Sequence, residues 1–307
     1  MCRLRLFPLL MMLLLLTSCR TPAPKDFTVE FLPSPSIQPP VLSVHIVGEN
    51  AVVRMDIETY VAGVVAGEIP NHWPLEALKA QAILARTFVL KFITEKHSRY
   101  PGADISTDIA EAQAYNAAAI NERVLRAVQE TAGLILLTED GELPYTWFHS
   151  HSGGMTETAV DGIDWNGPEP SYTKITAGME ADAAAWSAEF SAADFIAACK
   201  KAGANASSCK AVKVGQKGKS GRAVTLVVDG TTVNAARLRI SLGSTKMRST
   251  LLTKLSAEDG VVRMSGRGYG HGVGLSQWGA YAMAQAGKSA EEISLHYYNG
   301  LRLVKAW

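Results

Sequence analysis

The sequence predicts an α+β fold, with mixed helices and antiparallel sheet in a main lobe and a smaller β-rich lobe inserted at about residues 176–260. Helical and strand patterns interleave along the chain without the regular βαβ repeat that a parallel sheet requires. The chain has 307 residues, of which 47% are hydrophobic and 19% charged, so it can bury one large core or two modest ones.

The predicted main lobe begins with a hairpin and two helices. Alternating apolar and polar side chains at residues 41–47 and 51–55 are typical of paired strands. Asp56 can then cap a helix that reaches Val65. A longer helix follows, with Pro74 in its first turn. Its apolar residues recur at three- and four-residue steps along one face, at Leu75, Leu78, Ala82, Ala85, Val89 and Phe92.

The remaining patterns predict further elements of both kinds. Helices are expected at residues 116–131, 182–201, 235–242, 276–285 and 290–297. Strands are expected at residues 134–138, 145–150, 211–214, 222–228 and 261–265.

The first nineteen residues have the pattern of an export signal. Arg3 and Arg5 precede an apolar run that is too short to span a bilayer. The run ends in Leu-Thr-Ser-Cys, which resembles a bacterial lipobox and implies cleavage before Cys19 and acylation of its thiol. We therefore expect residues 1–18 to be a lipoprotein signal peptide. The exported protein would be lipid-anchored and would face the cell wall, in the periplasm or at the outer cell surface. A soluble secreted protein is the alternative.

Residues 19–40 are predicted to form a lipidated tether, because the segment is rich in proline and has no helical period. A chain of this kind could hold the domain at 41–307 up to roughly 60 Å from the membrane.

Export also makes thiols oxidisable, and Cys199 and Cys209 are the cysteines left after processing and lipidation. A disulfide between them is one expectation. A metal-binding pair is the weaker alternative, because there is no CxxC motif and no nearby histidine.

Residues 266–280 form an unusual segment in which glycine occupies alternate positions from Gly266 to Gly274. Glycines at this spacing are costly in chain entropy, so we expect something to pass close to the backbone. A tight connector before a helix is one interpretation. We favour a ligand-binding loop, because the segment also supplies a phenol, an imidazole, a hydroxyl and a carboxamide, from Tyr269, His271, Ser276 and Gln277.

Glu68 lies in a loop predicted between the first two helices, where Ile69 and Trp73 each precede a proline and are pushed towards extended conformations. A carboxyl group held beside apolar residues can lose part of its solvation, which raises its pKa towards the range useful to a general acid. An ordinary solvated loop glutamate fits these residues equally well.

Other polar residues are candidates with weaker patterns. Arg86 borders the apolar helix face and could bind a carboxylate or sugar substituent, or simply lie along the helix surface. His149 and His151 would face one side of a strand, as metal ligands could, but no third ligand is evident nearby. Ser152 could belong to a Ser–His–acid hydrolase, although the G-x-S-x-G motif is absent.

Taken together, five ordered blocks resemble the stage II sporulation protein D family, also described as the LytB or amidase-enhancer family. The blocks span essentially all of the predicted domain and lie at residues 60–70, 73–87, 127–133, 148–154 and 268–280.

This resemblance implies a peptidoglycan lytic transglycosylase that acts on glycan strands, best known on strands already stripped of stem peptides by an amidase. It implies that Glu68 is the catalytic acid. We expect the substrate to be bound by Arg86, His149, Ser152, Tyr269, His271 and Gln277. Some relatives bind zinc through cysteines and histidines, but no cysteine lies between Cys19 and Cys199, so we expect no metal and no cofactor. A nucleic-acid partner is not expected, because the formal net charge is only +1.

The single glutamate agrees with this chemistry. Glycosidases place two carboxyl groups around the bond. In a lytic transglycosylase, the C6 hydroxyl of N-acetylmuramic acid attacks its own C1, and proximity replaces the second carboxylate. Two alternatives stay open. One is a glycan-binding protein that activates an amidase without cutting. The other is a two-carboxylate hydrolase that uses Asp108, Glu111, Glu157 or Asp161.

Overall fold

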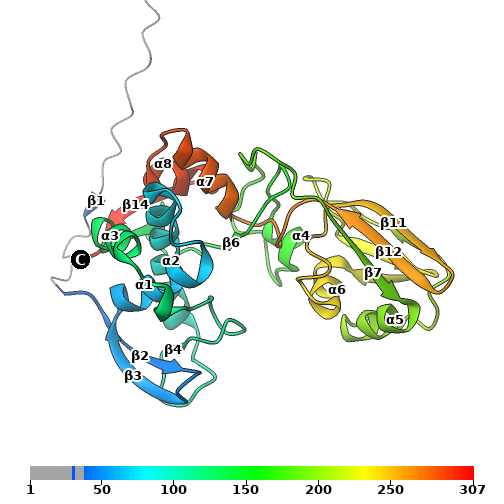
Figure 1. Ribbon diagram of the computed structural model, residues 1–307, viewed down its shortest axis with the longest axis horizontal. Helices are drawn as coiled ribbons and strands as arrows, with labels where there is room; N and C mark the ends of the chain where they lie inside the picture. Colours follow the sequence, from blue (N-terminus) through cyan, green and yellow to red (C-terminus); the bar gives the residue numbers. More distant parts are fainter. Residues whose placement is uncertain (1–29, 32–37) are drawn as a thin grey trace, which may run out of the picture.

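The computed structural model describes residues 30–31 and 38–307, so the predicted signal peptide and Cys19 lie outside the described residues. The predicted α+β class is confirmed, because the described chain contains eight α-helices and several small sheets, most of them antiparallel or mixed. Figure 1 shows these elements in two groups, joined by a narrower middle region. None of the helices in the described ranges is long and apolar enough to cross a membrane.

The first group is built around two helices that are buried along most of their length. The hairpin of β2 (Val41–Ile46) and β3 (Ala51–Asp56) leads into α1 (Ile57–Glu68), where the side chain of Asp56 accepts a hydrogen bond from the Thr59 amide at 2.9 Å. α1 packs on α2 (Leu75–Glu95), which has apolar residues buried on more than one face. This core also receives α3 (Glu122–Glu130), α7 (Gln277–Gln285) and α8 (Ala290–His296).

A mixed sheet closes this group. β14 (Leu301–Lys305) pairs antiparallel with β5 (Leu134–Thr138) and parallel with β1 (Glu30–Phe31). β1 falls inside the segment predicted to be a tether, and the pairing places these two residues against the domain. The short β4 (Ile105–Ser106) extends the hairpin sheet, beside β2.

The second group has its own hydrophobic core, formed by residues between Trp186 and Met264. One sheet has the order β11-β12-β7, formed by Leu252–Glu258, Val261–Gly266 and Trp186–Ser191. The other has the order β10-β9-β8, formed by Thr231–Asn234, Thr225–Val228 and Val212–Val214. The helices α5 (Ala192–Lys201) and α6 (Ala235–Leu242) pack against each other.

Cys199 and Cys209 both lie in this second core. They are free thiols in this structure, so the expected disulfide is not formed here. Burial raises the pKa of the Cys199 thiol to about 11, which disfavours the reactive thiolate.

Two predicted helices differ from the structure by more than their end residues. The helix expected at 116–131 is a short 3-10 turn at Ala117–Ala119 followed by α3, because the side chain of Asn121 accepts a hydrogen bond from the Val124 amide and starts a new helix there. The first half of the helix expected at 182–201 is the strand β7. Ser191 then caps α5 through the Asp194 amide.

The middle region brings distant segments of the chain together. β6 (Phe148–His149) pairs parallel with β13 (Leu275–Ser276). Next to this pair, His151 and Tyr269 exchange two backbone hydrogen bonds, of 2.9 and 2.8 Å. The short helix α4 (Ala159–Ile163) follows, and it contacts α6 of the second group. This pairing sets the histidine-containing block beside the glycine-rich block.

Candidate active site

A cavity of about 430 Å³ lies where these segments meet, and it holds five of the residues predicted for the site. They are Glu68, His149, Tyr269, His271 and Gln277. Its apolar lining comes from Phe88, Ile109, Ala112, Trp147 and Phe148.

Glu68 is the last residue of α1, and not a loop residue as predicted. The helix continues past Val65 and ends because Ile69, which precedes Pro70, adopts an extended conformation. One carboxyl oxygen of Glu68 accepts a hydrogen bond from the Ala114 amide at 2.7 Å. Gly67 permits this approach, since an added Cβ would lie 2.8 Å from the Ala114 carbonyl carbon.

Burial raises the pKa of the Glu68 carboxyl, and the hydrogen bonds from Ala114 and Gln277 offset only part of that effect. A larger fraction of Glu68 is therefore protonated near neutrality than of a solvated glutamate. The second carboxyl oxygen faces the amide nitrogen of Gln277 at 3.5 Å, and that nitrogen also lies 3.4 Å from Oε1 of Gln81. The carboxyl is thus held between α1, α2 and the start of α7.

The two cavity histidines are fixed as neutral rings. Nδ1 of His149 lies 3.1 Å from the Val273 carbonyl oxygen, so it must donate, which leaves Nε2 as an acceptor. Nδ1 of His271 accepts a hydrogen bond from the Val273 amide at 3.0 Å. Burial is the main cause that lowers the pKa of both rings, that of His271 to about 3. No cluster of side chains suited to hold a metal ion occurs among the residues that the structure describes.

The alternate glycines make room for the protein's own chain. A Cβ added to Gly270, at a φ of +119°, would lie 2.6 Å from Cβ of His149. At Gly274, at a φ of +69°, it would lie 1.9 Å from the Trp147 carbonyl oxygen. The close neighbour expected from the sequence is therefore the strand β6, and the segment is a left-handed connector before α7. The same tight path sets Tyr269 and His271 in the cavity wall.

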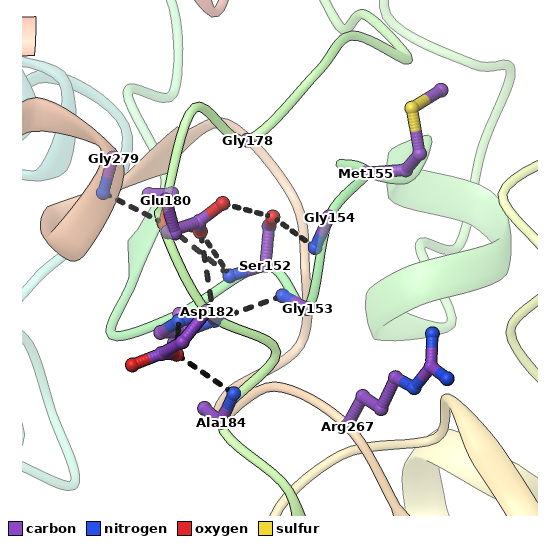
Figure 2. Close-up of polar contacts among 12 residues, drawn as sticks. Ser152, Gly153, Gly154, Met155, Gly178, Glu180, Asp182, Ala184, Arg267 and Gly279 are labelled. Carbon is purple, nitrogen blue, oxygen red and sulfur yellow. Dashed lines mark hydrogen bonds and ion pairs between the residues drawn. The ribbon is translucent and has the colours of Figure 1, made fainter. Parts of the chain in front are cut away.

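Ser152 does not line the cavity but belongs to a buried hydrogen-bond network. Figure 2 shows this network. Its hydroxyl donates to one carboxyl oxygen of Glu180 at 2.9 Å, and its amide donates to the other at 2.6 Å. The ring of His151 contacts Asp182 at 2.9 Å and the Gly153 amide at 3.0 Å, and its Nδ1 lies 3.7 Å from Glu180. No hydrogen bond joins the Ser152 and His151 side chains in the described structure, so the pair lacks the contact that a Ser–His hydrolase needs.

Arg86 also lies outside the cavity lining. Its guanidinium is fully buried and pairs with Glu58, with Nη2 at 2.5 Å from the carboxylate, and it donates to the Leu134 carbonyl oxygen at 2.9 Å. Glu58 also accepts hydrogen bonds from the Gly133 amide and from the indole of Trp307. The residue therefore joins α1, α2 and the chain around β5, and does not lie along the helix surface.

None of the four carboxyl residues considered for a hydrolase lines the cavity. Asp108 accepts a hydrogen bond from the Tyr100 hydroxyl, Glu111 from the Ser98 hydroxyl, and Glu157 from the Ser220 hydroxyl. Burial raises the pKa of Asp161, and the nearby charge of Glu157 adds to this effect. Within the described part of the chain, Glu68 is the one carboxyl group in the cavity wall.

Gln113 and Arg239 also line the cavity, although neither was predicted as a site residue from the sequence. Gln113 is 3% exposed, and neither polar atom of its carboxamide has a hydrogen-bond partner among the described residues. Arg239, on α6, is 8% exposed, and its Nε donates to the Arg248 carbonyl oxygen at 3.0 Å. No motif or spacing in the sequence marks either residue. Both become site candidates only in the structure, which shows a buried carboxamide without hydrogen bonds and a buried guanidinium without an ion pair among the described residues.

Comparison with known proteins places the chain among cell-wall proteins. A family model described as stage II sporulation protein matches residues 47–137, and a model of a domain of unknown function, DUF8618, matches residues 176–274. An uncharacterised protein of Brachyspira hyodysenteriae is 31% identical over 82% of this chain and 67% of its own length. Stage II sporulation protein D of Bacillus subtilis is 28% identical over 87% of this chain and 80% of its own length. The amidase enhancer of Bacillus subtilis is 28% identical over 78% of this chain and 40% of its own length.

Proposed function

Because this chain belongs to the stage II sporulation protein D family and its function is related to the cell wall, we propose that it is a peptidoglycan lytic transglycosylase with Glu68 as its catalytic acid and base. The observation that carries the proposal is that one carboxyl group of the described residues, that of Glu68, lies in the cavity wall with a pKa raised by burial. A hydrolase of the two-carboxylate kind would need a second carboxyl group on the other side of the sugar.

The reaction needs one proton donor and a nucleophile that the sugar itself provides. Protonated Glu68 donates its proton to the glycosidic oxygen between N-acetylmuramic acid and N-acetylglucosamine, and the C1–oxygen bond breaks. The C6 hydroxyl of the muramic acid then forms a bond to C1 and gives its proton to Glu68, which is thereby regenerated. The product ends in a 1,6-anhydro ring, and no water is consumed. The intramolecular hydroxyl gains from its high effective molarity.

The wall of the cavity supports binding of an acetylated sugar. The carboxamide of Gln113 offers one donor and one acceptor, which match the N–H and C=O of an acetamido group. Nε2 of His149 is a further buried acceptor without a partner among the described residues, suited to a sugar hydroxyl. Leaving such atoms unpaired is costly, so a ligand that pairs them recovers free energy. The apolar side chains nearby can contact the acetyl methyl group and the sugar face.

We further propose that the protein works from a lipid anchor at Cys19 and beside an amidase. The lipobox-like sequence is the support for the anchor. The name of one relative, amidase enhancer, is the support for the partner. An amidase that removes stem peptides would expose bare glycan strands to the cavity.

Digestion of amidase-treated sacculi tests whether the protein cuts or only binds. We expect the purified chain to release soluble glycan fragments in amounts that rise with time, as measured in the supernatant by chromatography. Intact sacculi, treated in parallel, show whether peptide removal is required. A protein that pellets with the glycan and releases nothing would be a binding protein, and this result would contradict the proposed activity.

A further inference from the structure

Arg239 is a buried cation without an anionic partner among the described residues. Its side chain lies on α6, and no carboxylate of the described residues forms an ion pair with it. Burying an unpaired guanidinium is expensive. Burial accordingly lowers the pKa of Arg239. A buried cation of this kind in a cavity wall is a candidate binding site for an anion.

The neighbouring charges show that this cation is available to a ligand. Arg239 lines the cavity of Glu68 and also a smaller adjoining cavity of about 200 Å³, which Asp164 lines as well. Asp164 is already bound by the guanidinium of Arg237 and by the amide of Asn234 at 2.8 Å. The carboxylate that lines the smaller cavity together with Arg239 is thus occupied by another arginine of the same helix.

Arg239 also lies apart from the catalytic carboxyl. Glu68 is supplied by the end of α1 and Arg239 by α6, which Figure 1 shows in different groups of elements. Both residues line the same cavity. The acid and the cation are therefore two contact points of one cavity wall for an extended substrate.

We infer that Arg239 forms a carboxylate-binding subsite, which takes the lactyl carboxylate of N-acetylmuramic acid. The planar guanidinium can donate two parallel hydrogen bonds to a carboxylate. The lactyl group ends in a free carboxylate when the stem peptide has been removed, and in a neutral amide when the peptide is attached. Arg239 would therefore be the residue that distinguishes bare strands from peptide-bearing strands. This inference rests on the proposed glycan substrate.

The test compares binding of two forms of the same short glycan strands, freed of peptides by an amidase. One form keeps its lactyl carboxylates, and in the other they are converted to amides with carbodiimide and ammonia. Binding is measured by calorimetry with the full chain carrying Glu68→Gln, so that turnover does not interfere. We expect the carboxylate form to bind at least about tenfold more tightly than the amide form, as for a buried charge pair.

Adding Arg239→Gln to this chain should remove the preference, so that both strands bind with the weaker affinity, whereas Arg239→Lys should retain part of it. Arg237→Gln combined with Asp164→Asn is the matched control, because it removes a paired arginine of the same helix without leaving its carboxylate free near Arg239; it should keep the full preference. An unchanged preference in a folded Arg239→Gln chain, or no preference in the parent, would overturn the subsite alone. Absence of binding to both strands would overturn the glycan substrate as well.

Discussion

Replacing Glu68 with Gln is expected to reduce the release of glycan fragments by at least about a hundredfold, because general acid–base catalysis contributes about 10² to 10⁴ in rate. The amide has nearly the shape of the carboxyl group but can neither protonate the leaving oxygen nor accept a proton from the C6 hydroxyl. The measurement is the initial rate of fragment release from peptide-stripped strands. The same variant should still bind those strands, since the cavity wall is otherwise unchanged.

The loss should not come from unfolding. Since the folded-state pKa of Glu68 is raised, the stability that it contributes is complete below its ordinary value of 4.5 and is lost as the pH rises through the folded-state pKa. Burial disfavours the charged form of Glu68, and the neutral amide of the Glu68→Gln variant avoids this cost. Its melting temperature at neutral pH should therefore equal or exceed that of the parent. Asp161→Asn is the matched control, because that carboxyl also has a raised pKa but lies outside the cavity lining. Full activity in Glu68→Gln, or loss of activity in the control, would argue against the assignment.

Replacing Arg86 with Met is expected to destabilise the protein by about 3 kcal/mol, because it leaves Glu58 as a largely buried carboxylate without its cation. For a chain of this size, that corresponds to a fall in melting temperature of roughly 6 to 12 °C. Thermal unfolding followed by circular dichroism measures the change. Arg126→Met is the matched control. Its ion pair with Glu130 is solvent-exposed, so the melting temperature should hardly change.

The same variant tests whether Arg86 has a role in the reaction. At a temperature at which Arg86→Met is folded, its rate of glycan cleavage per folded molecule should equal that of the parent, because Arg86 does not line the cavity. An Arg86→Met variant that kept its melting temperature but lost activity would show that Arg86 acts in the substrate site.

The fold class and the helices with strong periodicity could be predicted from the sequence. The helix expected from Pro74 onwards is α2, and the expected hairpin is that of β2 and β3. The prediction of one helix at residues 182–201 was wrong in its first part. The alanine-rich composition favours a helix throughout, but β7 is stabilised more by its pairing with β12 than a helix would be by local propensity. Tertiary pairing of this kind leaves little trace in a local pattern.

The site could be predicted in part. The motif blocks indicated Glu68, His149, Tyr269, His271 and Gln277, and the structure brings these side chains to one cavity. Arg86 and Ser152 share the same blocks but are buried in an ion pair and in a hydrogen-bond network. A block shows that its residues matter together, and it does not separate those that contact a ligand from those that support the fold. Gln113 and Arg239 become candidates only when buried polar atoms are paired in three dimensions.

The origin of the new chain end tests the central claim most directly, because Glu68 acting alone requires the sugar to supply its own nucleophile. Peptide-stripped strands are digested in water enriched in heavy oxygen, and the new muramic acid ends are analysed by mass spectrometry. We predict ends that are lighter than a reducing end by one water and that carry no heavy oxygen. Reducing ends labelled with one heavy oxygen would show that water is the nucleophile, and would contradict the single-carboxyl mechanism.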